Sequence, residues 1–107
     1  MLLDGKAVYS CLLLAADAQG HRITTVEGLS HGNRLSAVQE AMVEHDGYMC
    51  GFCTPGFVIA ITSLLNEHPS PTLDQVKTGL AGNLCRCGAY PRIFEAAMAA
   101  GHAEKGG

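Results

Sequence analysis

The stretch "MCGFCTPGFVIAITSLL" (49–65) places two cysteines shortly before the longest apolar run of the chain. Thr54 followed by Pro55 is typical of a helix start, because threonine caps free N–H groups and proline fits the first helical turn. Apolar side chains then recur at helical spacing, at Phe57, Ile61, Leu64 and Leu65. We therefore predict a buried helix over residues 55–67, which Pro69 prevents from continuing.

Three further helices are predicted around this one. Ser36 with Gln39 and Thr72 with Gln75 have the spacing of capping boxes, in which two side chains satisfy free N–H groups at a helix start. A last helix begins near Pro91. Their predicted apolar faces comprise Leu35, Val38 and Met42, then Leu73, Val76 and Leu80, and finally Ile93, Phe94, Ala97 and Met98. The fold class is therefore predicted to be mainly α.

The first part of the chain has a different pattern, which is typical of β structure. "LLDGKAVYS" contains Asp4-Gly5, a dipeptide favoured in tight hairpins, ahead of a short strand over residues 7–10. "HRITTVEGL" (21–29) is rich in β-branched residues and predicts a second strand. A hairpin and a further strand are thus expected before the helices begin.

Composition limits the classes of protein to which the chain can belong. It has 107 residues, of which 48% are hydrophobic, and this suits one small globular domain or parts of two. We divide it into a β segment at residues 1–31 and a helical domain at residues 32–107. The net charge of −3 and the scattered basic residues exclude the basic patch of a nucleic-acid-binding protein. The apolar run "FVIAI" is far shorter than the ~20 residues of a membrane helix, so no membrane insertion is expected.

The N-terminus faintly imitates a secretory signal with an A-x-A site at Ala16-Asp17-Ala18. Asp4 lies where such a signal requires a basic region, and the apolar stretch is broken at Tyr9-Ser10-Cys11. We therefore predict no signal peptide. Without one, metal or cluster ligation is favoured over disulfides for the five cysteines of the chain.

Four of these cysteines form two tight pairs. Cys50 and Cys53 make a C-x-x-C motif, and Cys85 and Cys87 make a C-x-C motif between two predicted helices. Such a set can form a closed four-thiolate site, for which zinc and an iron–sulfur cluster are the main candidates. Zinc ribbons use two C-x-x-C knuckles on hairpins, whereas one pair here is C-x-C and both pairs lie among helices. The spacing favours a [2Fe–2S] cluster and leaves zinc and disulfides open.

The surroundings of both pairs suit a cluster. An oxidised [2Fe–2S] core with four thiolates is doubly negative, so it needs N–H donors and little side-chain bulk nearby. Loops beside helix N-termini provide free N–H groups and the positive end of the helix dipole. Glycines that allow a close approach of the backbone flank the cysteines, at Gly51, Gly56, Gly82 and Gly88.

"CGFCTPG" (50–56) together with "GNLCRC" (82–87) closely resembles the helical [2Fe–2S] domain of the xanthine dehydrogenase and aldehyde oxidase family of molybdenum hydroxylases. "LDGKAVYSC" and "ITTVEGL" resemble the end of the plant-type ferredoxin domain that precedes it there. The resemblance covers residues 3–98, and "CGAYPRI" (87–93) is most similar to bacterial small iron–sulfur subunits. It implies a four-helix [2Fe–2S]-binding domain preceded by the C-terminal remnant of a β-grasp domain.

The resemblance implies that Cys50, Cys53, Cys85 and Cys87 bind the cluster, and that Cys87 lies against the pterin of the molybdenum cofactor. Met49 stands where the family usually has a glutamine that contacts the pterin, and methionine cannot donate the hydrogen bonds of an amide.

Cys11 matches the fourth ligand of a second, ferredoxin-type cluster, whose other ligands lie upstream of residue 1 in the family. We therefore expect an N-terminally truncated subunit. On this chain Cys11 is expected to have no cluster and to be buried as a small hydrophobic side chain.

The implied function is electron transfer from the molybdopterin cofactor to a second cluster or FAD, as one subunit of an oxidoreductase. No catalysis is expected from this chain alone. The expected partners are a large molybdopterin-binding subunit and an FAD-binding subunit, and the expected location is the cytoplasm, or the periplasm if an export signal lies upstream. The alternatives are a structural zinc module that uses the same four cysteines, and a metal-free helical interaction fragment.

Several other side chains are expected to be structural. Tyr90 and Phe52 are predicted to pack rather than to relay electrons. Glu40 and Glu44 are predicted to form the solvated face of the first helix. Surface positions are predicted for the histidines, which are His21, His31, His45, His68 and His102.

Overall fold

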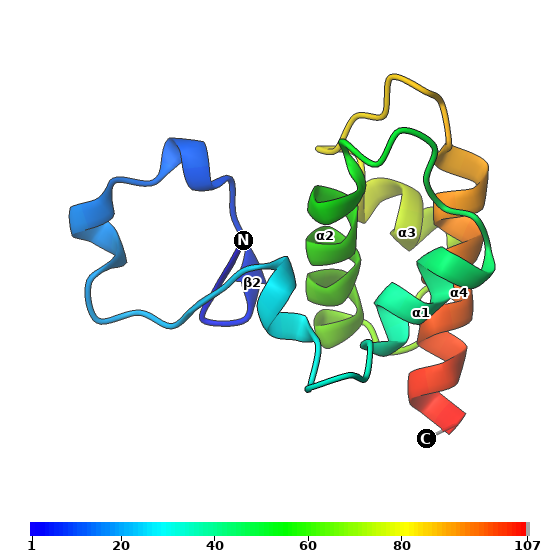
Figure 1. The fold of residues 1–107 in the computed structure, drawn as a ribbon, viewed down its shortest axis with the longest axis horizontal. Helices are drawn as coiled ribbons and strands as arrows, with labels where there is room; N and C mark the ends of the chain where they lie inside the picture. Colours follow the sequence, from blue (N-terminus) through cyan, green and yellow to red (C-terminus); the bar gives the residue numbers. More distant parts are fainter. Residues whose placement is uncertain (107) are drawn as a thin grey trace.

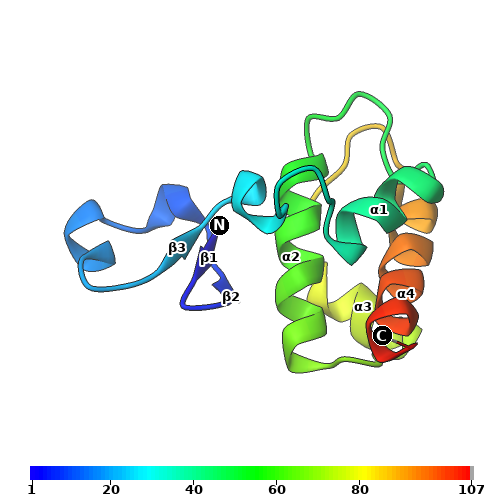
Figure 2. The same ribbon diagram turned by 60° about the horizontal axis from the view of Figure 1, so that its bottom comes forward.

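Four α-helices and a small antiparallel sheet make up the fold (Figure 1), in a computed structural model that describes residues 1–106 and the side-chain environments of residues 1–102. The helices are α1 (Ala37–Glu44), α2 (Thr54–Glu67), α3 (Leu73–Gly79) and α4 (Tyr90–Gly106). They gather on one side of the molecule, and the N-terminal segment extends from the other side (Figure 2). The prediction of a mainly α fold with a small β region before the helices is confirmed. None of the helices described combines the length and apolarity that crossing a bilayer requires.

The sheet has three very short strands, with β1 (Leu2–Leu3) between β2 (Lys6–Ala7) and β3 (Ile23–Thr24). Leu2 is paired with Ala7 on one side and with Thr24 on the other. Asp4 and Gly5 both have positive φ values, 51° and 86°, as a tight turn between β1 and β2 requires. The hairpin predicted from Asp4-Gly5 is therefore confirmed.

The extents of the two predicted strands are wrong. The strand expected over residues 7–10 ends at Ala7, and Ser10–Leu12 instead form a 3₁₀-helix, η1. A second 3₁₀-helix, η2, covers Ala15–Ala18.

The strand expected over residues 21–29 is also shorter than predicted, because Val26–Leu29 form a third 3₁₀-helix, η3. The Thr25 hydroxyl donates to the Glu27 carboxylate, and the Gly28 N–H donates to the Thr25 carbonyl at 3.0 Å. Local bonds of this kind compete with strand pairing.

The core lies between the helices, and its fully buried large side chains are Phe57, Ile61, Leu65, Val76 and Ile93. Both capping boxes are confirmed. At the start of α1 the Gln39 N–H donates to Ser36 Oγ at 3.2 Å, and the Ser36 N–H donates to Gln39 Oε1 at 2.8 Å. Thr72 and Gln75 form the same pair of bonds at the start of α3. The apolar stripe predicted for α2 is buried as expected.

Three helix positions differ from the prediction. Leu35, predicted to lie on the apolar face of the first helix, precedes the N-cap Ser36 and is 47% exposed. α2 begins at Thr54, so Cys53 occupies the N-cap position and Thr54 does not cap the helix. Leu73, predicted to be buried, is 45% exposed, because it is the first residue of a short helix.

The N-terminal segment is attached to α2 and to the loop after α3. The Ala7 N–H donates to Ser63 Oγ of α2 at 3.0 Å, and the Tyr9 hydroxyl donates to the Gly82 carbonyl at 2.6 Å. Val26 and Leu29 of η3 pack against the helical core. These contacts attach the N-terminal segment to the side of α2 and to the loop after α3.

Candidate metal centre

Two loops meet over the N-terminal end of α2, and they carry the four paired cysteines. The loop 45–53 connects α1 to α2, and the loop 80–89 connects α3 to α4; they lie side by side in both views (Figures 1 and 2). A Cβ at Gly56 would lie 3.3 Å from Asn83 Nδ2, so the absence of a side chain at Gly56 lets the second loop approach α2. The loops therefore face free N–H groups and the positive end of the α2 dipole.

Cys53 and Cys85 lie on the inner side of the two loops, where Cys85 belongs to the buried core and Cys53 packs against that core. Burial raises the pKa of the Cys53 thiol to about 11, and the neighbouring Cys85 thiol acts in the same direction. Residues that are far apart in the sequence are thus brought together at one site.

Backbone N–H groups surround the Cys85 sulfur. The Ala89 N–H, which lies 3.5 Å from Cys85 Sγ, holds the pKa of this thiol below its ordinary value. The N–H groups of Cys87 and Gly88 act in the same direction, while burial opposes them. The loop is therefore arranged to stabilise a thiolate at Cys85 before any metal is bound.

Cys50 and Cys87 complete the two motifs at the surface, since both side chains are exposed. The Phe52 N–H lies 3.5 Å from Cys50 Sγ and donates to it. Gly51 and Gly88 follow these cysteines with φ values of 84° and 75°, which L side chains rarely adopt. Each cysteine is thus followed by a sharp turn, and at Cys50 this turn brings the Phe52 N–H to the sulfur.

All five cysteines are free thiols. In the part of the chain that the structure describes, no three His, Cys, Asp or Glu side chains converge closely enough to hold one metal ion. The structure places Cys53 and Cys85 against the same core and leaves the Cys50 and Cys87 side chains exposed.

Tyr90, the first residue of α4, is hydrogen-bonded to the loop that carries Cys85. Its hydroxyl accepts the Cys85 N–H at 2.7 Å, and its ring meets Phe57 edge-on with centroids 6.2 Å apart. The prediction that Tyr90 packs is confirmed, but the sequence interpretation missed the contact of its hydroxyl with Cys85. The requirement that a buried tyrosine hydroxyl find a partner, close to a cysteine motif, is the signal that could have revealed it.

Phe52 does not pack, although this was predicted. Its side chain is 93% exposed, because it lies at the tip of the turn between Cys50 and Cys53. Met49, the predicted pterin contact, is also exposed, at 58%. Tyr48 and Leu84, which neighbour the cysteine motifs in the sequence, are exposed as well, and we call these four exposed apolar side chains the loop-tip patch.

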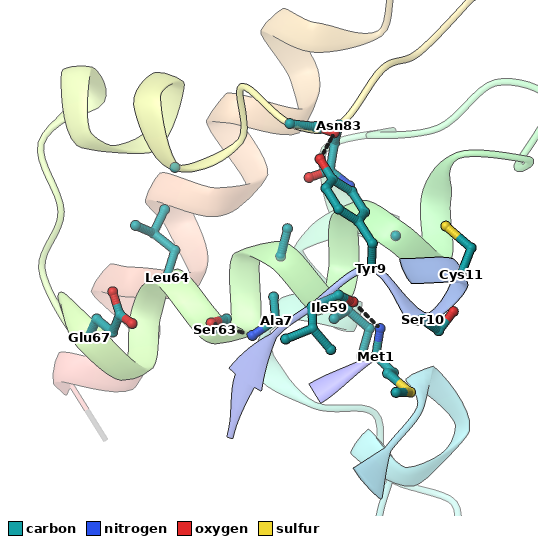
Figure 3. A pocket seen from close by; sticks show the side chains of 15 residues that line it. Met1, Ala7, Tyr9, Ser10, Cys11, Ile59, Ser63, Leu64, Glu67 and Asn83 are labelled. Atoms are coloured by element: carbon teal, nitrogen blue, oxygen red, sulfur yellow. Dashed lines mark hydrogen bonds between the residues drawn. The ribbon is translucent and has the colours of Figure 1, made fainter. Parts of the chain in front are cut away.

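Cys11 lies in η1 and is exposed, so the prediction that it is buried is wrong. It lines a hollow of about 460 Å³ between the N-terminal segment and α2 (Figure 3). In this view the Tyr9 ring extends toward the loop that contains Asn83, and Cys11 lies on another side of the same hollow. Its position in a short 3₁₀-helix, where no residue is buried, explains the exposure.

The remaining predictions for single residues agree with the structure. Glu40 and Glu44 are exposed on α1. His21, His31, His68 and His102 are exposed, and His45 is partly exposed with Nδ1 4.0 Å from Glu95 Oε2.

Comparisons with known proteins give consistent matches. A family model described as "[2Fe-2S] binding domain" matches residues 25–98. The nicotine 6-hydroxylase small subunit of Paenarthrobacter nicotinovorans is 52% identical over 98 residues, which cover 92% of this chain and 59% of that protein. The xanthine dehydrogenase iron-sulfur-binding subunit of Escherichia coli O157:H7 is 46% identical over 101 residues, covering 92% and 63%. The chain thus spans about three fifths of the length of these relatives.

Solved structures share the whole fold. Quinoline 2-oxidoreductase from Pseudomonas putida 86 superposes with a TM-score of 0.91 at 44% identity, covering 99% of this chain and 67% of that one. Aldehyde oxidoreductase from Desulfovibrio gigas gives a TM-score of 0.92 at 36% identity, covering 98% of this chain and 12% of that one. The small sheet and the helices are therefore arranged as in these structures.

Proposed function

Because the chain belongs to the [2Fe-2S] binding domain family of molybdenum hydroxylase small subunits, we propose that it transfers electrons between redox centres of such an oxidoreductase. Electrons would come from the molybdopterin cofactor of a large partner subunit and pass to a second cluster or FAD. The observation that carries the proposal is the placement of Cys53 and Cys85 against the helical core, on two adjacent loops whose N–H groups reach the sulfurs of Cys50 and Cys85.

The residues that would hold the cluster are Cys50, Cys53, Cys85 and Cys87. Four thiolates are the usual ligand set of a [2Fe–2S] cluster, and the bound cluster supplies a carrier that accepts and releases one electron at a time. The site fits a negatively charged group, because N–H groups from both loops already reach Cys50 and Cys85. The positive end of the α2 dipole adds to this effect.

The protein residues determine how readily an electron is accepted. Hydrogen bonds from backbone N–H groups to sulfur stabilise negative charge and raise a reduction potential, and burial opposes this. The Ala89 N–H that donates to Cys85 would therefore raise the reduction potential of the bound cluster. Tyr90 holds this loop in position through its bond to the Cys85 N–H. Phe52 supplies its N–H on the exposed side.

The exposed side of the site is where a partner subunit would approach. Cys87 is exposed there, and we propose that it and Met49 face the pterin. The loop-tip patch is the apolar surface that contact with the molybdopterin-binding subunit would bury. Met49 can pack against the cofactor but cannot donate the hydrogen bonds of an amide.

This chain by itself would bind no substrate and carry out no catalysis. Its partners would be the large molybdopterin-binding subunit and an FAD-binding subunit, and its proposed location is the cytoplasm, or the periplasm if an export signal lies upstream. The division into a ferredoxin-like remnant at 1–31 and a cluster domain at 32–107 is part of the same proposal.

Anaerobic reconstitution tests the cofactor assignment. The purified chain is incubated with iron and sulfide, or with zinc, and its visible absorption, iron, zinc and acid-labile sulfide are measured. We expect two irons and two sulfides per chain, with the absorption of a [2Fe–2S] cluster. Binding of one zinc and no iron would instead support the structural zinc module that uses the same four cysteines.

A further inference from the structure

The Thr54 hydroxyl is buried and has no hydrogen-bond partner among the residues that the structure describes. The other buried hydroxyls among the described residues have partners. Thr62 donates to the Val58 carbonyl at 2.8 Å, and the Ser36 and Thr72 hydroxyls accept capping bonds. A buried hydroxyl without a partner reduces stability, so its presence at Thr54 requires an explanation.

The usual local partners of a helical threonine are closed to Thr54. Cys53 occupies the N-cap position of α2, and its carbonyl accepts the Phe57 N–H at 3.2 Å. Thr54 is the first residue of the helix, so no carbonyl lies one turn before it within α2. The bond that Thr62 makes to Val58 therefore has no counterpart at Thr54.

The position of Thr54 on α2 directs its side chain toward the cysteine loops. Thr54 precedes Phe57 by three residues and so shares its helix face. The Phe57 ring contacts Tyr90, whose hydroxyl accepts the Cys85 N–H. Side chains of an α-helix lean toward its N-terminus, and at α2 this is the end where the loops of Cys53 and Cys85 meet.

We propose that the Thr54 hydroxyl donates its hydrogen to a sulfur atom of the cluster and thereby raises the reduction potential of the cluster. The proposal rests on the function proposed above. Reduction by one electron adds one negative charge to the bound group, and an O–H donor stabilises the more negative form. Thr54 thus tunes the potential without being a cluster ligand.

The substitution Thr54→Val tests this, because valine keeps the shape of threonine and removes the hydroxyl. The whole chain is reconstituted with iron and sulfide and titrated with dithionite against redox dyes. At a fixed ambient potential the ratio of reduced to oxidised cluster should fall about tenfold in the Val variant, which is ~59 mV for a one-electron couple. Thr54→Ser keeps the donor and should keep the wild-type ratio. A loaded Val variant with the wild-type potential would overturn the proposal.

The metal-free protein gives an independent readout. Because the hydroxyl has no protein partner, Thr54→Val should unfold at a higher urea concentration than the metal-free wild type. Unfolding at a lower concentration would mean that the hydroxyl is satisfied within the protein, and this would also overturn the proposal. If the wild-type chain takes up no iron at all, the proposed function fails as well, whereas an unchanged potential in a loaded variant refutes only the role of Thr54.

Discussion

The helical part of the molecule, residues 37–106, and the N-terminal segment, residues 1–30, keep their shapes in different ways. The helices enclose the fully buried large side chains, such as Phe57 and Ile93. In the segment, Leu2 belongs to the buried core, whereas Tyr9, Leu12 and Leu14 are all more than half exposed. The segment is held by hydrogen bonds to Ser63 of α2 and to Gly82, and by Val26 and Leu29 at its end, which pack against the helical core.

This difference matters for the cysteines. Cys85 is anchored in the helical part, where N–H groups and Tyr90 fix its loop. Cys11 stands on a 3₁₀-helix with no buried residue. Among the described residues, backbone N–H bonds to cysteine sulfur thus occur at Cys50 and Cys85 in the loops beside α2, and not at Cys11; the variants below test this contrast.

The largest contrast is expected between the two cysteine variants Cys85→Ser and Cys11→Ser. Loss of Cys85 removes a sulfur that already accepts the Ala89 N–H, so iron and sulfide content after reconstitution should fall by at least about tenfold. Cys11→Ser should leave both contents unchanged. Metal and sulfide analysis measures this, and iron loss in the Cys11 variant would show that Cys11 is a ligand.

Unfolding of the metal-free chain in urea, followed by circular dichroism, compares the two regions directly. Phe57 is 0% exposed, and Phe57→Ala should lower the free energy of unfolding by ~3–5 kcal/mol through lost contacts and a cavity. Leu12 is 79% exposed, and Leu12→Ala should change it by less than about 0.5 kcal/mol. Equal effects would mean that the segment shares the core of the helices.

Tyr9→Phe should loosen the segment and leave the helices intact. The variant loses the hydroxyl that donates to the Gly82 carbonyl at 2.6 Å, a bond worth roughly 0.5–1.5 kcal/mol. Amide hydrogen exchange should become faster in residues 8–13 and stay unchanged in α4. The control is Tyr48→Phe in the loop 45–53, and equally fast exchange of residues 8–13 in that variant would contradict the local role of Tyr9.

The smallest effect is expected at the hairpin turn. The Arg22 N–H, which donates to Asp4 at 2.9 Å, and then the His21 side chain hold the pKa of Asp4 below 3.8. Because the pKa of Asp4 is lowered in the folded state, its ionised carboxylate stabilises the fold above pH 3.8. This stabilisation is lost as the pH falls through the folded-state pKa. The NMR signal of the Arg22 amide should therefore shift below pH 3.8 and stay constant in Asp4→Asn. A wild-type signal that does not move would contradict the interaction.

The features that were correctly predicted depend on local chemistry. Ser36 with Gln39 and Thr72 with Gln75 specify helix starts within four residues, so they can be recognised without the fold. Asp4-Gly5 specifies its turn in the same way. The cysteine pairs mark the site because their spacing and their glycine neighbours restrict the chemistry that they can perform.

The features that were missed depend on distant contacts. The Tyr90 hydroxyl acquires its role only when the loop 80–89 folds back over α4. Cys53 replaces Thr54 as the N-cap because both loops pack over the start of α2. The exposure of Phe52 and Cys11 likewise depends on where their turns lie in the fold, which no local pattern specifies. The ligand set itself stays a prediction.

Native mass spectrometry of the anaerobically reconstituted chain tests the central claim most directly, because it counts the bound atoms. The account predicts that the mass of one chain increases by two irons and two sulfurs, and that Cys11→Ser shows the same increase. An increase by a single metal ion without sulfur, or no increase at all, would contradict it.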